Sequence, residues 1–216
     1  MKINKLSTQR RMEDIQCTFG LPSLCAKVLA AKDLANDEIA ALLQEPKLSD
    51  PFCANGVKEV ADRLYQAKQK KEKVLVCGDY DADGICATAI MVDALRSYGI
   101  DCGFYIPNRF SEGYGLHENT VGLAKQKGYT LLITVDNGVK AKTALSFAHT
   151  MGIDVIVTDH HSMDEEVTCL QLVHPTLMGE PFTTLSGAGV ALMLSRALIG
   201  EKKEHVVLAC VAAIAD

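Results

Sequence analysis

The sequence has no long apolar segment and no export signal. Its 216 residues contain no run that approaches the roughly 18 apolar residues of a membrane-spanning helix. The first residues, MKINKLSTQRRMEDIQ, are charged, but no apolar stretch follows them as it would in a secretory signal. These absences argue against a membrane protein and predict a cytoplasmic location.

The sequence also lacks an excess of positive charge and any C-x-x-C pair. A net charge of −5 is unlike that of a generally basic protein that coats nucleic acid. A nucleic-acid enzyme remains compatible with this charge, because clustered carboxylates that hold metal ions lower the total. Without C-x-x-C pairs a zinc ribbon is not expected. Most of the eight cysteines lie in apolar stretches, so we expect reduced thiols that pack in the core.

From residue 74 onward, short apolar runs alternate with amphipathic segments. The apolar runs predict strands at 74–77, 103–106, 131–135, 154–158 and 170–173. The other segments predict helices at 85–98, 117–127, 140–151, 189–199 and 205–214. Strands that alternate with helices form a mostly parallel, doubly wound sheet. We therefore predict an α/β fold in which about five strands are flanked by helices.

The residues before position 74 have a weaker pattern. Residues 1–22 are expected to be extended or irregular. Two short helical patterns follow within 24–43, either as a packed two-helix cap or as a helix-turn-helix, and a helix is predicted at 55–70. We therefore divide the chain into a small, partly helical N-terminal lead-in at residues 1–50 and a main domain at residues 51–216.

Three of the predicted strands run directly into acidic or imidazole side chains. The first leads into GDYDADG at residues 78–84, the third into Asp136, and the fourth into the DHH triplet at 159–161. In an open parallel sheet, ligands bind beyond the carboxyl ends of the strands. We therefore expect these side chains to share one rim of the sheet.

These acids admit a structural and a functional interpretation. A single aspartate after a strand is most often the N-cap of the next helix, which would fit Asp83, Asp136 or Asp159 taken alone. It does not account for three acids within five residues and acids at two further strand ends, because crowded carboxylates repel each other unless cations neutralise them. Carboxylates with imidazole suit Mn²⁺ or Mg²⁺. Two ions fit the number of acids better than one, with Asp136 as the expected bridging ligand.

A glycine-containing segment, SGAG at residues 186–189, begins another predicted helix. The backbone N–H groups of Gly187 and Gly189 are candidates for binding a phosphate of the substrate. Close packing of the helix against a neighbour is the alternative interpretation. The segment is not a dinucleotide-binding fingerprint, because the G-x-G-x-x-G pattern fails at Leu192.

Five segments, taken in order, resemble the motifs of a known family. They are GDYDADG at 78–84, PNRFSEGYGL at 107–116, TVDNG at 134–138, TDHH at 158–161 and LSGAGVALML at 185–194. They are similar to the successive motifs of the RecJ family, within the DHH phosphoesterase superfamily. The second segment favours RecJ over the pyrophosphatases and small-nucleotide phosphodiesterases of that superfamily. The resemblance covers about residues 50–216 and implies degradation of single-stranded DNA from the 5′ end in recombination and repair.

The resemblance implies a set of metal ligands. Asp81 and Asp136 would hold one Mn²⁺ ion. The second ion would be held by a larger set: Asp83, Asp136, His160 and Asp216. Mg²⁺ is the alternative metal.

The resemblance also implies roles in catalysis and substrate binding. Asp79 would lie beside the first ion, Asp159 would orient a histidine, and His161 would face the scissile phosphate. Arg109 would contact a DNA phosphate, or would instead form a surface ion pair. Unpaired bases would stack on aromatic side chains, for which the candidates are Phe110, Tyr114 and Tyr105, the last more often a core residue.

Two features depart from the family pattern. Many superfamily members have a metal-binding histidine four residues before the position of Asp81, where this chain has Cys77. The first ion would then be held more weakly, or completed by Asp79 and water. RecJ proteins also continue beyond the position of Asp216, so the chain is expected to be truncated at its C-terminal end. A single-stranded-DNA-binding protein or a helicase would be a partner through that missing part.

Two alternative functions stay open at the level of sequence. One is a DHH phosphodiesterase that acts on short oligonucleotides or cyclic dinucleotides. The other is a non-catalytic DHH-like scaffold that binds DNA or a replication partner. Degraded acidic motifs would favour the scaffold, whereas the motifs of this chain are intact.

Overall fold

The computed structural model describes residues 5–32, 34–44 and 48–216, with side chains from residue 11 onward. The chain divides into two compact units, Met1–Leu48 and Ser49–Asp216. Within the described ranges, none of the helices has the length and apolarity needed to cross a membrane.

The first unit consists of three helices around a small core. They are α1 (Lys5–Phe19), α2 (Ser23–Ala31) and α3 (Asn36–Leu43). The expectation of an extended or irregular segment at 1–22 is wrong for α1, while residues 1–4 lie outside the described residues. Met12, Ile15 and Phe19 recur at helical spacing and pack in the core of this unit, where Ile15 is buried. The apolar face is too narrow, among many polar residues, to stand out in the sequence.

The second unit is built on a sheet of five parallel strands. They are β1 (Val74–Cys77), β2 (Cys102–Tyr105), β3 (Leu131–Val135), β4 (Asp154–Thr158) and β5 (Gln171–Val173). Their order in the sheet is β2-β1-β3-β4-β5. The predicted α/β fold is confirmed. The central strands β1 and β3 are buried along their whole length, as near-continuous apolar runs predict for a parallel sheet covered on both faces.

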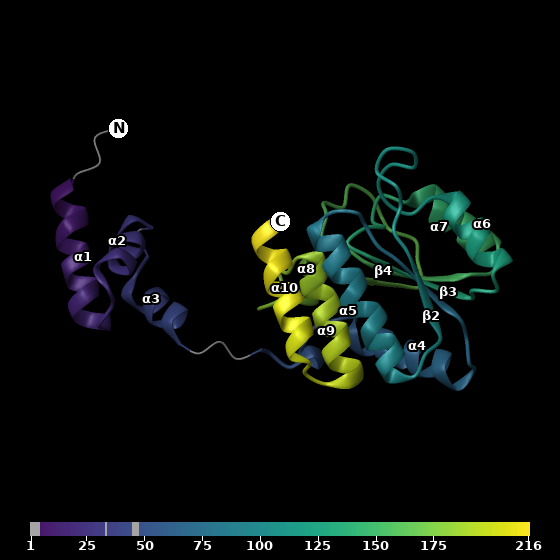
Figure 1. The fold of residues 1–216 in the computed structure, drawn as a ribbon, viewed down its shortest axis with the longest axis horizontal. Helices are drawn as coiled ribbons and strands as arrows, with labels where there is room; N and C mark the ends of the chain where they lie inside the picture. The colour runs from purple at the N-terminus through teal and green to yellow at the C-terminus, as the bar shows by residue number, and fades with distance from the viewer. Residues whose placement is uncertain (1–4, 33, 45–47) are drawn as a thin grey trace. The chain divides into compact units, whose positions relative to one another are not determined.

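Helices cover both faces of the sheet (Figure 1). On one face, the core joins alternate strand residues such as Val74 and Val76 to the helices α4 (Val57–Gln69), α5 (Ala82–Tyr98), α9 (Gly187–Ile199) and α10 (Lys203–Ala215). On the other face, Leu75 and Cys77 pack with α6 (Glu118–Gln126) and α7 (Lys142–Thr150). Two short helices, η1 (Pro51–Cys53) and α8 (Pro175–Met178), complete this unit.

The strand order places a switch point between β1 and β3. The chain leaves β1 through α5 toward β2 on one side, whereas β3, β4 and β5 lie on the other side of β1. In doubly wound sheets, the crevice beyond the carboxyl ends of the strands at such a point is the usual ligand site. The GDYDADG loop and Asp136 follow the two strands that flank this crevice.

Candidate metal centre

The loop after β1 turns directly into α5. Asp81 is the N-cap of this helix, since its Oδ1 accepts a hydrogen bond from the Gly84 N–H at 2.9 Å. The helix therefore begins at Ala82, three residues before the predicted start. A Cβ atom at Gly84 would lie 2.7 Å from the Cβ of Asp79, so only glycine permits the acids to crowd together here.

Asp136 follows β3 in an unusual backbone conformation. Its φ of 62° lies in the left-handed region, which aspartate tolerates better than most residues. The neighbouring Asn137 donates hydrogen bonds from Nδ2 to the carbonyl oxygens of Cys77 and Val135, at 3.0 and 2.9 Å. These contacts tie the ends of β1 and β3 together and hold the buried Asp136 side chain at the switch point.

The DHH triplet follows β4, and its aspartate organises the two histidines. Asp159 is fully buried, and its Oδ1 accepts from His161 Nδ1 at 2.8 Å and from the backbone N–H groups of His160 and His161. Its Oδ2 accepts from the Val139 N–H at 3.0 Å. Burial alone would raise the pKa of Asp159, but the hydrogen bonds from His161 and Val139 outweigh it and lower the pKa. Asp159 is therefore an ionised group that fixes the ring of His161.

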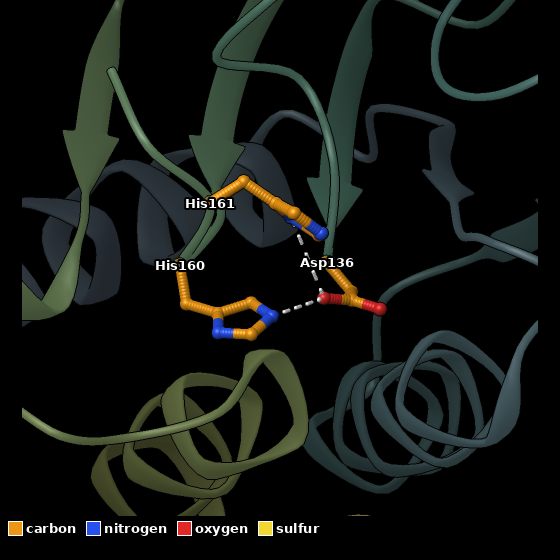
Figure 2. Close-up of side chains that lie close together, drawn as sticks. All are labelled: Asp136, His160 and His161. Atoms are coloured by element: carbon orange, nitrogen blue, oxygen red, sulfur yellow. Dashed lines mark ion pairs between the residues drawn. The ribbon is translucent and has the colours of Figure 1, made fainter. Parts of the chain in front are cut away.

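Side chains from three loops and the C-terminal helix converge at the switch point. His160 Nε2 lies 3.1 Å from Asp136 Oδ1, and His161 Nδ1 lies 4.0 Å from the same oxygen (Figure 2). His160 Nε2 is also 3.6 Å from Asp83 Oδ2 and 4.0 Å from Asp216 Oδ2. Residues that are more than a hundred positions apart in the sequence thus form one cluster.

The donor atoms of this cluster fit divalent metal ions. Three overlapping groups have ligand atoms within 4.8 Å of one another: Asp79, Asp81 and Asp136; Asp83, His160 and Asp216; and Asp136, His160 and His161. Within the described part of the chain, Asp79 Oδ1, Asp136 Oδ1 and His160 Nε2 are buried without a hydrogen-bond partner. Asp136 Oδ1 and His160 Nε2 lie close to each other, but the angles of this contact do not meet hydrogen-bond geometry. Buried polar atoms of this kind require a partner, and oxygen with imidazole suits Mn²⁺ or Mg²⁺.

The electrostatics of the cluster also favour a cation. Burial, together with the charges of Asp83 and Asp81, raises the pKa of Asp136 to about 7 despite its contact with His160. The Asp136 carboxylate in turn raises the pKa of His160 to about 9. Burial raises the pKa of Asp79, and the charge of Asp81 adds to this effect. These carboxylates carry unfavourable negative charge that a bound cation would neutralise.

The N-terminus of α9 does not offer free N–H groups to a phosphate, contrary to our expectation for Gly187 and Gly189. The Gly187 N–H donates to Asp83 Oδ2 at 2.7 Å, and the Ala188 N–H donates to Asp83 Oδ1 at 2.8 Å. The Gly189 N–H donates to Ser186 Oγ at 3.3 Å, and this hydroxyl also contacts Asp83. The positive end of the helix therefore stabilises a buried carboxylate of the protein itself.

Cys77, at the position where many superfamily members have a histidine, packs in the core. Its side chain belongs to the apolar cluster under α6 and α7. Burial raises the pKa of its thiol to about 12, so the thiol is neutral at ordinary pH and is a poor metal ligand. An ion beside the loop after β1 would therefore be held by the acids of that loop and not by Cys77.

Two polar residues that the sequence did not mark as part of the site support the DHH triplet. His174, buried after β5, accepts the Thr176 N–H at Nδ1, so its Nε2 carries the proton that donates to the His161 carbonyl oxygen at 2.9 Å. Tyr114, named only as a base-stacking candidate, donates its hydroxyl to the Asp136 carbonyl oxygen at 2.9 Å and lies 3.0 Å from His161 Nδ1. No pattern in the sequence indicates His174, whereas Tyr114 lies in the PNRFSEGYGL segment, one of the five that resemble family motifs.

The remaining substrate-binding candidates are Arg109 and Phe110 on an exposed loop, and Tyr105, which is half-buried at the end of β2. Arg109 places its guanidinium 5.2 Å from the ring centre of Tyr80, and it forms no ion pair with any residue in the described ranges. Phe110 is 97% exposed, so its ring is available for contact. The hydroxyl of Tyr105 is hydrogen-bonded to Glu112.

Comparison with known proteins agrees with these observations. Residues 73–215 match the family model described as "DHH family, N-terminal domain". The chain is 38% identical over 215 residues to the single-stranded-DNA-specific exonuclease RecJ of Bacillus subtilis, covering 96% of this chain and 27% of that protein. It therefore spans about a quarter of the length of this relative.

Two solved structures are similar in fold. A crystal structure of exonuclease RecJ bound to manganese superposes with a TM-score of 0.69 at 37% identity, covering 76% of this chain and 43% of that one. A crystal structure of RecJ in complex with Mn²⁺ from Thermus thermophilus superposes with a TM-score of 0.74 at 28% identity. This match covers 96% of this chain and 30% of that one.

Proposed function

Because the chain belongs to the DHH family, we propose that it is the metal-dependent phosphodiesterase domain of a single-stranded-DNA exonuclease. The observation that carries this proposal is the convergence of carboxylates and imidazoles at the switch point, with buried donor atoms that have no hydrogen-bond partner among the described residues. The names of its relatives support single-stranded DNA as the substrate. Digestion from the 5′ end rests on the resemblance alone.

The three ligand groups support a site for two Mn²⁺ ions, with Mg²⁺ as the alternative. Asp79, Asp81 and Asp136 would hold one ion. The other would be held by Asp136 together with Asp83, His160 and Asp216. When bound, such ions polarise a phosphoryl oxygen and lower the pKa of water. Asp136 belongs to the proposed ligand sets of both ions and is therefore the natural bridging ligand.

The other site residues would bind and orient the substrate. Asp159 holds Nδ1 of His161, which leaves Nε2 of that ring as the atom to face the scissile phosphate. Arg109, beside Tyr80 on the exposed loop, would pair with a phosphate of the DNA backbone. Phe110 would stack with an unpaired base. Contacts to phosphate and to the faces of bases do not depend on sequence, as expected for an exonuclease.

The proposal predicts that the full-length protein releases mononucleotides from single-stranded DNA only when Mn²⁺ or Mg²⁺ is present. The measurement follows labelled single strands of increasing length, a matched duplex and a cyclic dinucleotide, with EDTA as the control. We expect long single strands to be degraded fastest. A preference for the shortest strands or the cyclic dinucleotide would favour the alternative DHH phosphodiesterase. DNA binding without metal-dependent hydrolysis of any of these substrates would favour the non-catalytic scaffold.

A further inference from the structure

A second polar cluster lies at the end of α10 opposite to Asp216. His205, in the first turn of this helix, is buried, with only 2% of its surface exposed. Its Nδ1 lies 2.7 Å from Ser195 Oγ of α9, and its Nε2 lies 2.8 Å from Asp93 Oδ2 of α5. Lys202, the N-cap residue of α10, pairs with the same carboxylate oxygen. This cluster links three helices and includes none of the candidate metal ligands.

The cluster contains serine, histidine and aspartate but is not a second hydrolytic site. Ser195 is completely buried, so no substrate reaches its hydroxyl. In a catalytic triad the nucleophile must be accessible and must be aimed at a bound carbonyl carbon. The contacts of Ser195, His205 and Asp93 instead satisfy polar groups between packed helices. Their location at the start of α10 points to a role in fixing this helix.

The packing of α10 explains why polar contacts matter there. Its buried side chains are those of His205, Ala209 and Ala212, while Val206 and Leu208 are partly buried and pack against the same core. These apolar contacts hold the helix against α5 and α9, but hydrophobic attraction has no preferred direction. Hydrogen bonds have defined directions, and those to a charged group are the stronger kind. The Lys202 and His205 contacts also lower the pKa of Asp93, which keeps this carboxylate ionised.

We propose that Asp93, His205 and Ser195 are positioning residues that orient α10 so that Asp216 reaches the metal centre. From His205 to Asp216 the helix advances by about 16 Å, at roughly 1.5 Å per residue. A small tilt of the helix at its first turn therefore moves the far end by a distance that matters for a metal ligand, which must be held within about 0.5 Å. Asp216 Oδ2 lies 4.0 Å from His160 Nε2, at the edge of the cluster, where such a shift has the largest effect. This inference rests on the proposed function for its metal-binding consequence.

The test compares Mn²⁺ binding by the full chain and by Asp93→Ala, measured by titration calorimetry and electron paramagnetic resonance. Asp93 is partly exposed, so its removal is less disruptive than removal of buried His205. We expect one of two binding events to weaken about tenfold while the other is unchanged, which is the lower end of the loss seen when a group that orients a metal ligand is removed. Asp93→Asn keeps an acceptor for His205 and is expected to restore most of the affinity. Asp101→Ala, at an exposed aspartate before β2, is the matched control and is expected to bind like the parent.

A double-mutant cycle with Asp216→Ala separates positioning from general stability. If Asp93 acts through Asp216, Asp93→Ala has no further effect on Mn²⁺ affinity once Asp216 is removed. Additive losses, equal weakening of both ions, or unchanged binding in Asp93→Ala would each overturn the inference.

A measurement without metal keeps this test separate from that of the proposed function. Amide hydrogen exchange of residues 209–215 is expected to accelerate in Asp93→Ala and to be normal in the Asp101→Ala control. Unchanged exchange would overturn the inference even if Mn²⁺ binds. If the parent chain binds no Mn²⁺, the proposed function fails, while the exchange result still decides whether this cluster holds α10.

Discussion

Replacing Asp136 by asparagine is expected to reduce metal-dependent hydrolysis by at least about 1,000-fold, the scale seen when one member of a catalytic unit is removed. Asp136 lies in two of the three candidate ligand groups, and its Oδ1 is 3.1 Å from His160 Nε2. An amide has no negative charge and binds a hard cation poorly. Hydrolysis of single-stranded DNA measures the loss of activity, and Mn²⁺ titration measures the loss of metal affinity.

The backbone of Asp136 makes asparagine a better variant than alanine for this test. At a φ of 62°, asparagine is tolerated because its short polar side chain can form local hydrogen bonds, whereas alanine lacks them and bears the full cost of about 1–2 kcal/mol for crowding of Cβ against the carbonyl oxygen. We expect both variants to lose hydrolysis and only Asp136→Ala to lose stability against denaturant. Substantial residual hydrolysis in Asp136→Asn would contradict the bridging role of this residue.

Replacing Gly187 by alanine is expected to reduce hydrolysis about 100-fold, although this residue offers no ligand atom. A Cβ atom at this position would lie 2.5 Å from Oδ1, 2.6 Å from Cβ and 2.7 Å from Cγ of Asp136. Because α9 is packed against the sheet and Asp136 directly follows β3 within that sheet, the Asp136 carboxylate must move. A displacement of about 1 Å at a reacting centre can cost a factor of about 100. Mn²⁺ affinity is expected to fall together with activity.

The matched control lies two residues further along α9. A Cβ atom at Gly189 would meet the Leu185 side chain at 3.1 Å, which can adjust, and it would not contact any metal ligand. Gly189→Ala is therefore expected to stay within a few-fold of the parent in hydrolysis. Equal losses in the two variants would show that the contact with Asp136 is not the cause. Normal Mn²⁺ binding by Gly187→Ala would contradict the geometry described for the site.

The sheet is predictable from sequence because its signals are local. Apolar runs such as Leu131–Val135 are buried over their full length, and a parallel strand covered on both faces requires such a run. The same reasoning places acids at the rim of the sheet, because the carboxyl ends of parallel strands coincide. The start of α5 is predicted three residues late, since Asp81 and not Asp83 supplies the cap. The motif holds several aspartates, and the pattern alone does not distinguish a cap from a ligand.

The rest of the site depends on contacts between distant segments. Asp83 accepts from the Gly187 N–H, 104 residues further along the chain, and no periodicity in the sequence indicates that pair. For this reason the sequence alone suggests that the N–H groups of the SGAG segment are free for phosphate. His174 escapes prediction for the same reason, since its contact with the His161 carbonyl exists only once β4 and β5 are paired. In α1, only a few apolar residues face the core, so their helical spacing does not stand out among the polar residues.

The most direct test is anomalous diffraction at the manganese absorption edge from crystals of the chain soaked in Mn²⁺. Two peaks are predicted at the rim of the sheet on either side of Asp136, one beside Asp79 and Asp81 and the other beside Asp83, His160 and Asp216. Peaks found only at other places on the surface, or none at all at saturating Mn²⁺, would contradict the account.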